Sequence, residues 1–170
     1  MSKRDYISLL RESIQRGMKE KFEKEGFLKP VAFFLHNPPA DEHFPPIPVP
    51  VVIPIGRYFG DTNWKTCLSY AMHKMCENPL IIAAGFVAEA NCAKFKDDDE
   101  LGKLVASGAM RIDELKNHDD IIMMVFSTPV KEEIFIYSVD IKNKKVGERY
   151  PEANGFVGLL TNLFGWSSKN

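Results

Sequence analysis

Residues 47–55 constrain the fold of this chain more than any other segment. They read Ile-Pro-Val-Pro-Val-Val-Ile-Pro-Ile, so branched aliphatic residues alternate with positions of which three hold proline. Alternation of β-branched residues with a period of two is typical of a β-strand. Proline lacks the N–H that a sheet needs, which confines a proline-containing strand to the edge of a sheet. All three prolines fall on the same alternate positions, so one backbone edge loses its donors while the other can still pair. The segment therefore predicts an edge strand that resists pairing with a second sheet, and a polyproline II segment docked on the core is the alternative.

The composition favours one folded domain and disfavours several classes of protein. The chain has 170 residues, of which 45% are hydrophobic and 26% charged, which argues against disorder. Lys and Arg (22) balance Asp and Glu (23), so the net charge of −1 disfavours a non-specific nucleic-acid binder. Three cysteines do not suggest a disulfide framework, and no apolar run is long enough for a signal peptide or a membrane span. We therefore expect a cytoplasmic protein without membrane contact.

Apolar spacing predicts two long helices and about five strands. Apolar residues recur every four positions from Tyr6 to Phe22, which predicts a helix over 3–25 that Ser2 caps and Gly26 ends. A second helix is predicted over 62–77, and a short acidic one begins near 97. Strands are predicted at 31–35, 47–55, 80–90, 121–126 and 131–140, with a hairpin turn at 142–145.

These elements predict an α+β fold. We expect a single domain over residues 1–155, built on a mostly antiparallel sheet of about five strands packed against two main helices. Both helices are expected on the same face of this sheet. Residues 156–170 form a separate apolar C-terminal segment.

The run Phe86-Val87-Ala88-Glu89-Ala90, which ends an apolar strand and precedes an acidic loop, carries a resemblance. In this respect residues 28–150 resemble small uncharacterised proteins that recur in phage and bacterial genomes. In those proteins a similar strand ends in a Val-x-Glu-Ala-type sequence and is followed by an acidic, irregular loop. The resemblance implies an α+β fold and a phage or bacterial origin, and it implies no known activity.

Glu89 is the first candidate for chemistry. It follows nine apolar or small residues, 80–88, so its carboxylate could be partly buried. Burial without a partner raises the pKa of a carboxylate, as a general base or metal ligand requires. The alternative is that the strand has reached the end of the sheet, where Glu89 faces solvent or pairs with Lys65, Lys94 or an arginine.

A proline-rich loop supplies the second candidate. His36, Asp41, Glu42 and His43 lie within eight residues and are ligand types that zinc uses. Their spacing matches no known metal motif, so a solvated loop is the alternative. The chain also has no Gly-x-Ser-x-Gly and no glycine-rich phosphate loop. A small metal-dependent hydrolase that uses His36, His43 and Glu89 is the alternative function.

The C-terminal segment is the candidate partner surface. Its apolar residues follow helical spacing and would form a large patch if exposed. The segment either docks on its own domain or contacts a protein partner or a second copy of the chain. Its candidate contact residues are Phe156, Leu159, Leu160, Leu163, Phe164 and Trp166.

Charge is distributed unevenly along the chain. Residues 97–120 carry eight acidic and three basic side chains, whereas residues 142–149 are basic. Opposite patches of this kind can steer partners or promote self-association, and solvated surface is the alternative. The leading hypothesis is a non-enzymatic accessory or binding protein without a cofactor, which acts through protein–protein contacts.

Overall fold

The computed structural model contains one six-stranded sheet, in which every neighbouring pair is antiparallel and the order is β2-β1-β3-β4-β5-β6. It describes residues 2–40, 46–56, 62–93, 95–96, 98–107, 109–150 and 162–165. The predicted α+β class is confirmed, with six strands rather than about five because the segment after the 142–145 turn also pairs. The elements are α1 (Lys3–Glu25), β1 (Val31–His36), β2 (Val49–Pro54), α3 (Thr62–Cys76), β3 (Ile81–Cys92), α4 (Glu100–Ala106), the 3-10 turn η1 (Ile112–Glu114), β4 (Asp119–Ser127), β5 (Glu132–Asp140) and β6 (Lys145–Arg149).

Helix α1 begins and ends where the sequence predicts. The Ser2 hydroxyl accepts a hydrogen bond from the Asp5 N–H, and the Asp5 carboxylate accepts one from the Ser2 N–H at 2.7 Å. Gly26 ends the helix with a left-handed φ of 82°, a conformation that glycine adopts without strain. Because the apolar residues share one face, the helix buries Leu10, Met18 and Phe22 against the sheet.

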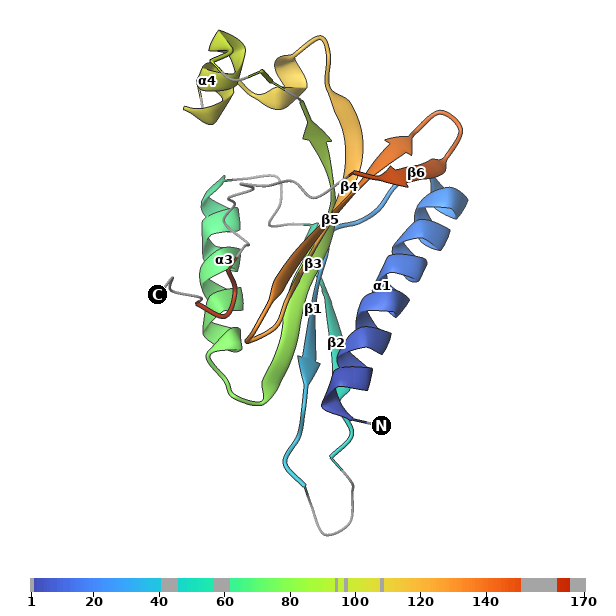
Figure 1. The fold of residues 1–170 in the computed structure, drawn as a ribbon, viewed down its shortest axis with the longest axis vertical. Coiled ribbons are helices and arrows are strands. Elements are labelled where there is room, and N and C mark those ends of the chain that lie inside the picture. Colours follow the sequence, from blue (N-terminus) through green and yellow to red (C-terminus); the bar gives the residue numbers. More distant parts are fainter. Residues whose placement is uncertain are drawn as a thin grey trace.

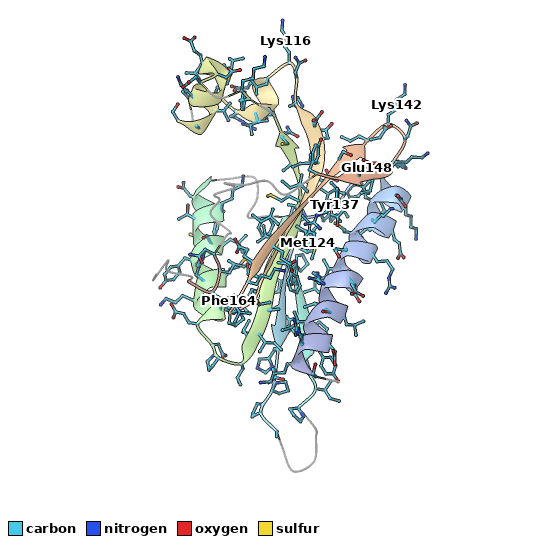
Figure 2. The ribbon with its side chains drawn as sticks, in the orientation of Figure 1. Lys116, Met124, Tyr137, Lys142, Glu148 and Phe164 are labelled. Atoms are coloured by element: carbon cyan, nitrogen blue, oxygen red, sulfur yellow. The ribbon has the colours of Figure 1, made fainter. Side chains whose placement is uncertain are left out.

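The two long helices cover opposite faces of the sheet (Figure 1). Phe33 and Leu35 of β1 pack in the cluster that contains α1, whereas Ala32 and Phe34 pack in the cluster that contains α3. The prediction that both helices lie on one face is therefore wrong. Its physical cause is the nearly continuous apolar sequence of the central strands, which leaves both faces of the sheet to be covered. Figure 2 shows Tyr137 on the α1 side of the sheet and Phe164 on the α3 side.

The proline-containing segment forms the edge strand β2, as predicted. Its partner in the sheet is β1, and the Ile55 N–H donates to the Pro30 carbonyl at 2.9 Å. Because backbone amides alternate in direction along a strand, the odd-numbered amides point toward β1 and the even-numbered positions point outward. Pro48, Pro50 and Pro54 occupy outward positions, so Val52 supplies the remaining outward N–H between residues 48 and 54.

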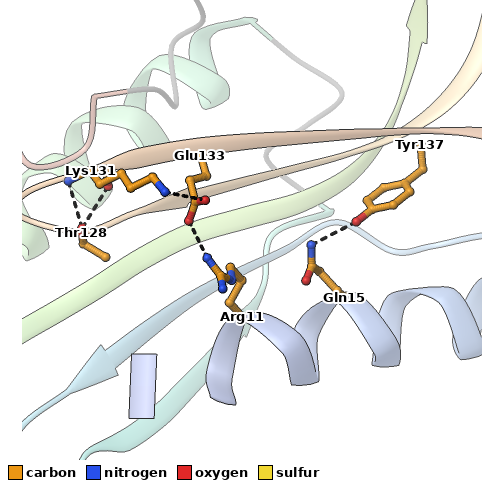
Figure 3. Close-up of polar contacts among 6 residues, drawn as sticks. All are labelled: Arg11, Gln15, Thr128, Lys131, Glu133 and Tyr137. Atoms are coloured by element: carbon orange, nitrogen blue, oxygen red, sulfur yellow. Dashed lines mark hydrogen bonds and ion pairs between the residues drawn. The ribbon is translucent and has the colours of Figure 1, made fainter. Parts of the chain in front are cut away.

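Polar contacts attach α1 to β5 (Figure 3). The Arg11 guanidinium donates to the Glu133 carboxylate at 2.8 Å, and Lys131 pairs with the other oxygen of that carboxylate at 2.8 Å. One helical turn away, Gln15 donates to the Tyr137 hydroxyl at 3.0 Å. Burial alone would raise the pKa of Glu133, but the hydrogen bonds from Lys131 and Arg11 outweigh it and hold that pKa below its ordinary value.

We expect Arg11→Met to destabilise the protein in a pH-dependent way. A carboxyl group whose pKa is lowered on folding stabilises the folded state above its unfolded pKa, near 4.5, and loses that contribution as the pH falls through its folded pKa. The variant should therefore be less stable than the wild type by roughly 0.5–1 kcal/mol at pH 7. Urea unfolding at pH 7 and at pH 3 checks this, because the difference should shrink at the lower pH. An equal difference at both values would contradict a role for the charged pair.

Candidate functional site

An apolar groove of about 320 Å³ lies between α3 and the edge strand β2. Ala32 and Phe34 of β1 form its floor, and Ile53 with the adjacent Ile55 forms the wall on the β2 side. The other wall is helix α3, whose lining residues are Trp64, Cys67, Leu68, Ala71, Met72 and Met75. Apart from the indole N–H of Trp64 and the thiol of Cys67, these side chains carry no polar group, so recognition here comes mainly from apolar burial.

Large apolar side chains around this groove are accessible to solvent. Trp64 is 54% exposed, Met75 is 39% exposed and Ile53 is 37% exposed. Single exposed apolar residues are ordinary, but a contiguous group marks an interaction surface. Because methionine is flexible and polarizable, a wall with two methionines can adapt to the shape of an apolar occupant.

The apolar stripe of α3 is wide enough to serve two surfaces. At about 100° per residue, Trp64, Ala71 and Met75 lie on one side of the helix, whereas Cys76 lies further round. Met72 and Cys76 are buried against the sheet at 2% and 7% exposure. One part of the stripe therefore attaches α3 to the core, and the other part forms the groove.

Positive charge lies beside the apolar wall at Lys74, which directly precedes the groove residue Met75. The other basic residues of α3 lie elsewhere: Lys65 lines the larger cleft described below, and His73 lies about 160° round the helix from Met75. Helix α3 contains no acidic residue, and β2 contains no charged residue. Lys74 pairs with Glu77 at 2.9 Å, but both side chains are more than half exposed. Exposed pairs of this kind contribute little to stability, so a carboxylate of a partner can compete for the ammonium group.

Glu89 does not occupy the buried position that a general base would need. Its side chain is exposed, although the preceding Ala88 is fully buried. The backbone N–H of Leu28 donates to its carboxylate, which attaches the segment after α1 to β3. Glu89 is thus exposed, as the alternative expects, but the strand has not reached the end of the sheet, because β3 continues to Cys92 and Glu89 pairs with Ile122 of β4.

The sheet register also keeps His36 away from Glu89. His36 pairs with Ile81 of β3, and Glu89 lies eight residues further along that strand. At about 3.3 Å per residue, these positions are roughly 26 Å apart. A shared metal site built on His36 and Glu89 is therefore wrong, because the two residues lie toward opposite ends of the strand pair. Asp41, Glu42 and His43 lie outside the described residues, and within the described part of the chain no three His, Cys, Asp or Glu side chains are placed to hold a metal ion.

A larger cleft of about 670 Å³ lies near the ends of β3 and β4 that adjoin η1. Its lining mixes charges of both signs. The Arg111 guanidinium pairs with the Asp113 carboxylate at 2.6 Å, and the Glu89 carboxylate is held by Leu28 as described above. This pairing leaves the cleft without a set of convergent groups that indicates a particular ligand.

The described part of the C-terminal segment packs against its own domain. Leu163 is 1% exposed within the cluster on the α3 side, and Phe164 is partly buried against the same cluster. The Glu132 carboxylate accepts hydrogen bonds from the Asn162 N–H at 2.7 Å and from the Ser127 hydroxyl at 2.5 Å. Leu163 is thus a core residue. The other predicted contact residues, Phe156, Leu159, Leu160 and Trp166, lie outside the described residues.

We expect the cysteines of α3 to differ strongly in reactivity. Cys67 is exposed in the groove, whereas burial raises the pKa of the Cys76 thiol to about 12. Because the thiolate is the reactive form, iodoacetamide at pH 8 should modify Cys67 rapidly and leave Cys76 unmodified until the protein unfolds. Peptide mapping by mass spectrometry, with and without urea, measures both rates. Equal rates in the folded protein would contradict the placement of α3.

Comparisons with protein-family models, with curated proteins and with solved structures gave no match. The resemblance to phage and bacterial proteins therefore stays a prediction. Among the helices that the structure describes, none is long and apolar enough to cross a membrane.

Proposed function

We propose that this chain is a non-enzymatic binding protein that acts through protein–protein contact. Its docking site is the apolar groove between α3 and β2. The observation that carries the proposal is the group of half-exposed apolar side chains around that groove, Trp64, Met75 and Ile53.

The occupant is an α-helix rather than an added strand. In the sheet formed by the described residues, the edge strands at which a further strand could join are β2 and β6. The outward edge of β2 has lost its N–H donors at three prolines, and β6 is short and carries Lys145, Glu148 and Arg149. By contrast, the groove follows α3 from Trp64 to Met75, roughly 17 Å at 1.5 Å per residue, which accommodates about three turns of a helix.

The chemistry of the groove defines the partner helix. Its apolar residues must recur at i, i+3 or i+4 to fill an apolar groove. Its flank should carry Asp or Glu, because Lys74 lies beside the groove and α3 has no acidic residue. The partner is therefore an amphipathic, acidic helix.

Met75→Glu should abolish partner binding, because it places a carboxylate in the apolar groove and repels an acidic helix. Thr66→Glu is the matched control. Thr66 is exposed on the same helix, does not line the groove and lies about 180° round the helix from Met75. The immobilised wild type and both variants are exposed to the same bacterial lysate, and the retained proteins are quantified by mass spectrometry.

The proposal expects a protein that the wild type and Thr66→Glu retain equally and that Met75→Glu retains at least about tenfold less, a loss of about 1.4 kcal/mol in binding. Circular dichroism of all three proteins verifies that they are equally folded. If Met75→Glu and Thr66→Glu retain the same proteins in the same amounts, the groove is not the docking site.

A further inference from the structure

Helix α4 presents apolar side chains that the described part of the chain leaves about half-exposed. None of its residues is buried, and Leu101 and Leu104 are 46% and 41% exposed. The two leucines are three residues apart, so they share one face of the helix. Figure 1 shows α4 beyond the end of α3, away from the layers formed by the sheet and the two long helices.

The same helix is acidic where it begins. Asp98 and Asp99 precede it and Glu100 is its first residue, whereas Lys103 is the one basic residue between 98 and 106. Lys103 pairs with Asp98 at 3.5 Å, but the Asp98 side chain is 95% exposed and remains accessible. Helix α4 is therefore amphipathic and acidic, which is the chemistry that the α3–β2 groove favours.

We propose that α4 of one copy of this chain docks in the α3–β2 groove of a second copy. This inference rests on the proposed function and names the partner. Leu101 and Leu104 enter the apolar groove, while Asp98, Asp99 and Glu100 lie toward Lys74. The helix, roughly 10 Å long, fits within the roughly 17 Å that the groove spans along α3. Because α4 buries no residue in its own chain, it does not fill its own groove.

This contact is heterologous, since a helix on one copy meets a groove on the next. An assembly of any length then keeps one free helix at one end and one free groove at the other, so association continues until a ring closes or an open assembly grows. A two-turn helix buries little area, so the association is weak and shows at high protein concentration. Screening of the charges by salt should weaken it further.

Two variants that each remove one half of the contact test the proposal. Met75→Glu places a carboxylate in the apolar groove, and Leu104→Lys places a positive charge on the apolar face of α4. Thr66→Glu is the control for the first variant. Ala106→Lys is the control for the second, because Ala106 is exposed on the same helix about 160° round from Leu104. Sedimentation velocity of each protein over a range of concentrations measures the self-association.

The proposal expects the wild type and both controls to associate, and expects each single variant to sediment as a monomer at the highest concentration used. When Met75→Glu and Leu104→Lys are mixed in equal amounts, an intact α4 meets an intact groove, and a one-to-one complex forms that grows no further. A wild type that stays monomeric, a mixture that forms no complex, or a control that also dissociates would overturn the proposal. If the wild type does not self-associate, but Met75→Glu retains less of some other protein from the lysate than the wild type does, the groove is still a docking site. Only the proposal that its partner is a second copy of the chain is then wrong.

Discussion

Replacing Gly85 with alanine is expected to lower the free energy of unfolding by about 3 kcal/mol or more, because the site has no room for a methyl group. Gly85 lies between Phe33 on β1 and Phe126 on β4, and the two rings stack across it with centroids 5.6 Å apart. A Cβ atom at this position would lie 2.5 Å from Cζ of Phe33 and 1.9 Å from the backbone oxygen of Val125. A side chain can rotate away, but the carbonyl belongs to the neighbouring central strand and can move only with the sheet.

Thermal unfolding measures this effect, and the midpoint of Gly85→Ala should fall by roughly 6–12 °C. Gly17→Ala is the matched control. Gly17 lies inside α1, and a Cβ atom there would meet nothing within 4 Å. The same substitution should therefore raise stability by about 0.5–1 kcal/mol, the ordinary gain of alanine over glycine in a helix. Equal midpoints for Gly85→Ala and the wild type would show that the aromatic stack does not close over the glycine.

Leu163→Ala is expected to lower the free energy of unfolding by about 2–4 kcal/mol, the usual cost of a cavity left by a buried leucine. Leu163 is 1% exposed and packs in the cluster on the α3 side, and the adjacent Asn162 N–H is held by Glu132. The loss would assign this residue a structural role rather than a role in partner binding.

Urea unfolding monitored by circular dichroism provides the measurement, and Leu9→Ala provides the control. Leu9 is 51% exposed on α1, so the identical substitution there should change stability by less than about 0.5 kcal/mol. If both variants unfold at the same urea concentration, residues 162–165 do not contribute to the core.

Features that depend on local chemistry could be predicted from the sequence. The Ser2–Asp5 capping box and Gly26 define α1 through contacts within a few residues, and these rules hold in any fold. The edge position of β2 follows from proline itself, because no tertiary arrangement restores the missing N–H.

The placement of the helices could not be predicted in the same way. An amphipathic strand shows which face is buried, but residues 80–88 are apolar or small throughout and give no such signal. The register in which β1 pairs with β3 could not be predicted either, and this register separates His36 from Glu89.

The apolar residues of the groove were visible in the sequence, but their exposure was not. Trp64, Met72 and Met75 appear in the sequence as one apolar face, and such a face ordinarily packs entirely on the core. Trp64 and Met75 stay half-exposed because, among the strands that the structure describes, the sheet ends at β2 and none lies beyond it. The one available signal was the width of the apolar stripe on α3. From Cys67 to Cys76 this stripe covers about half of the helix circumference, which is wider than the stripe that packs against a single surface.

Occupancy of the groove can be read directly from Cys67, whose thiol is part of the groove wall. The measurement compares the alkylation rate of Cys67 in the dilute free protein with its rate in the complex of the wild-type protein and its partner. If the α3–β2 groove is the docking site, alkylation slows in proportion to the fraction of occupied grooves and returns to the free rate when the complex dissociates. An unchanged rate in a fully formed complex would place the partner elsewhere and contradict the account.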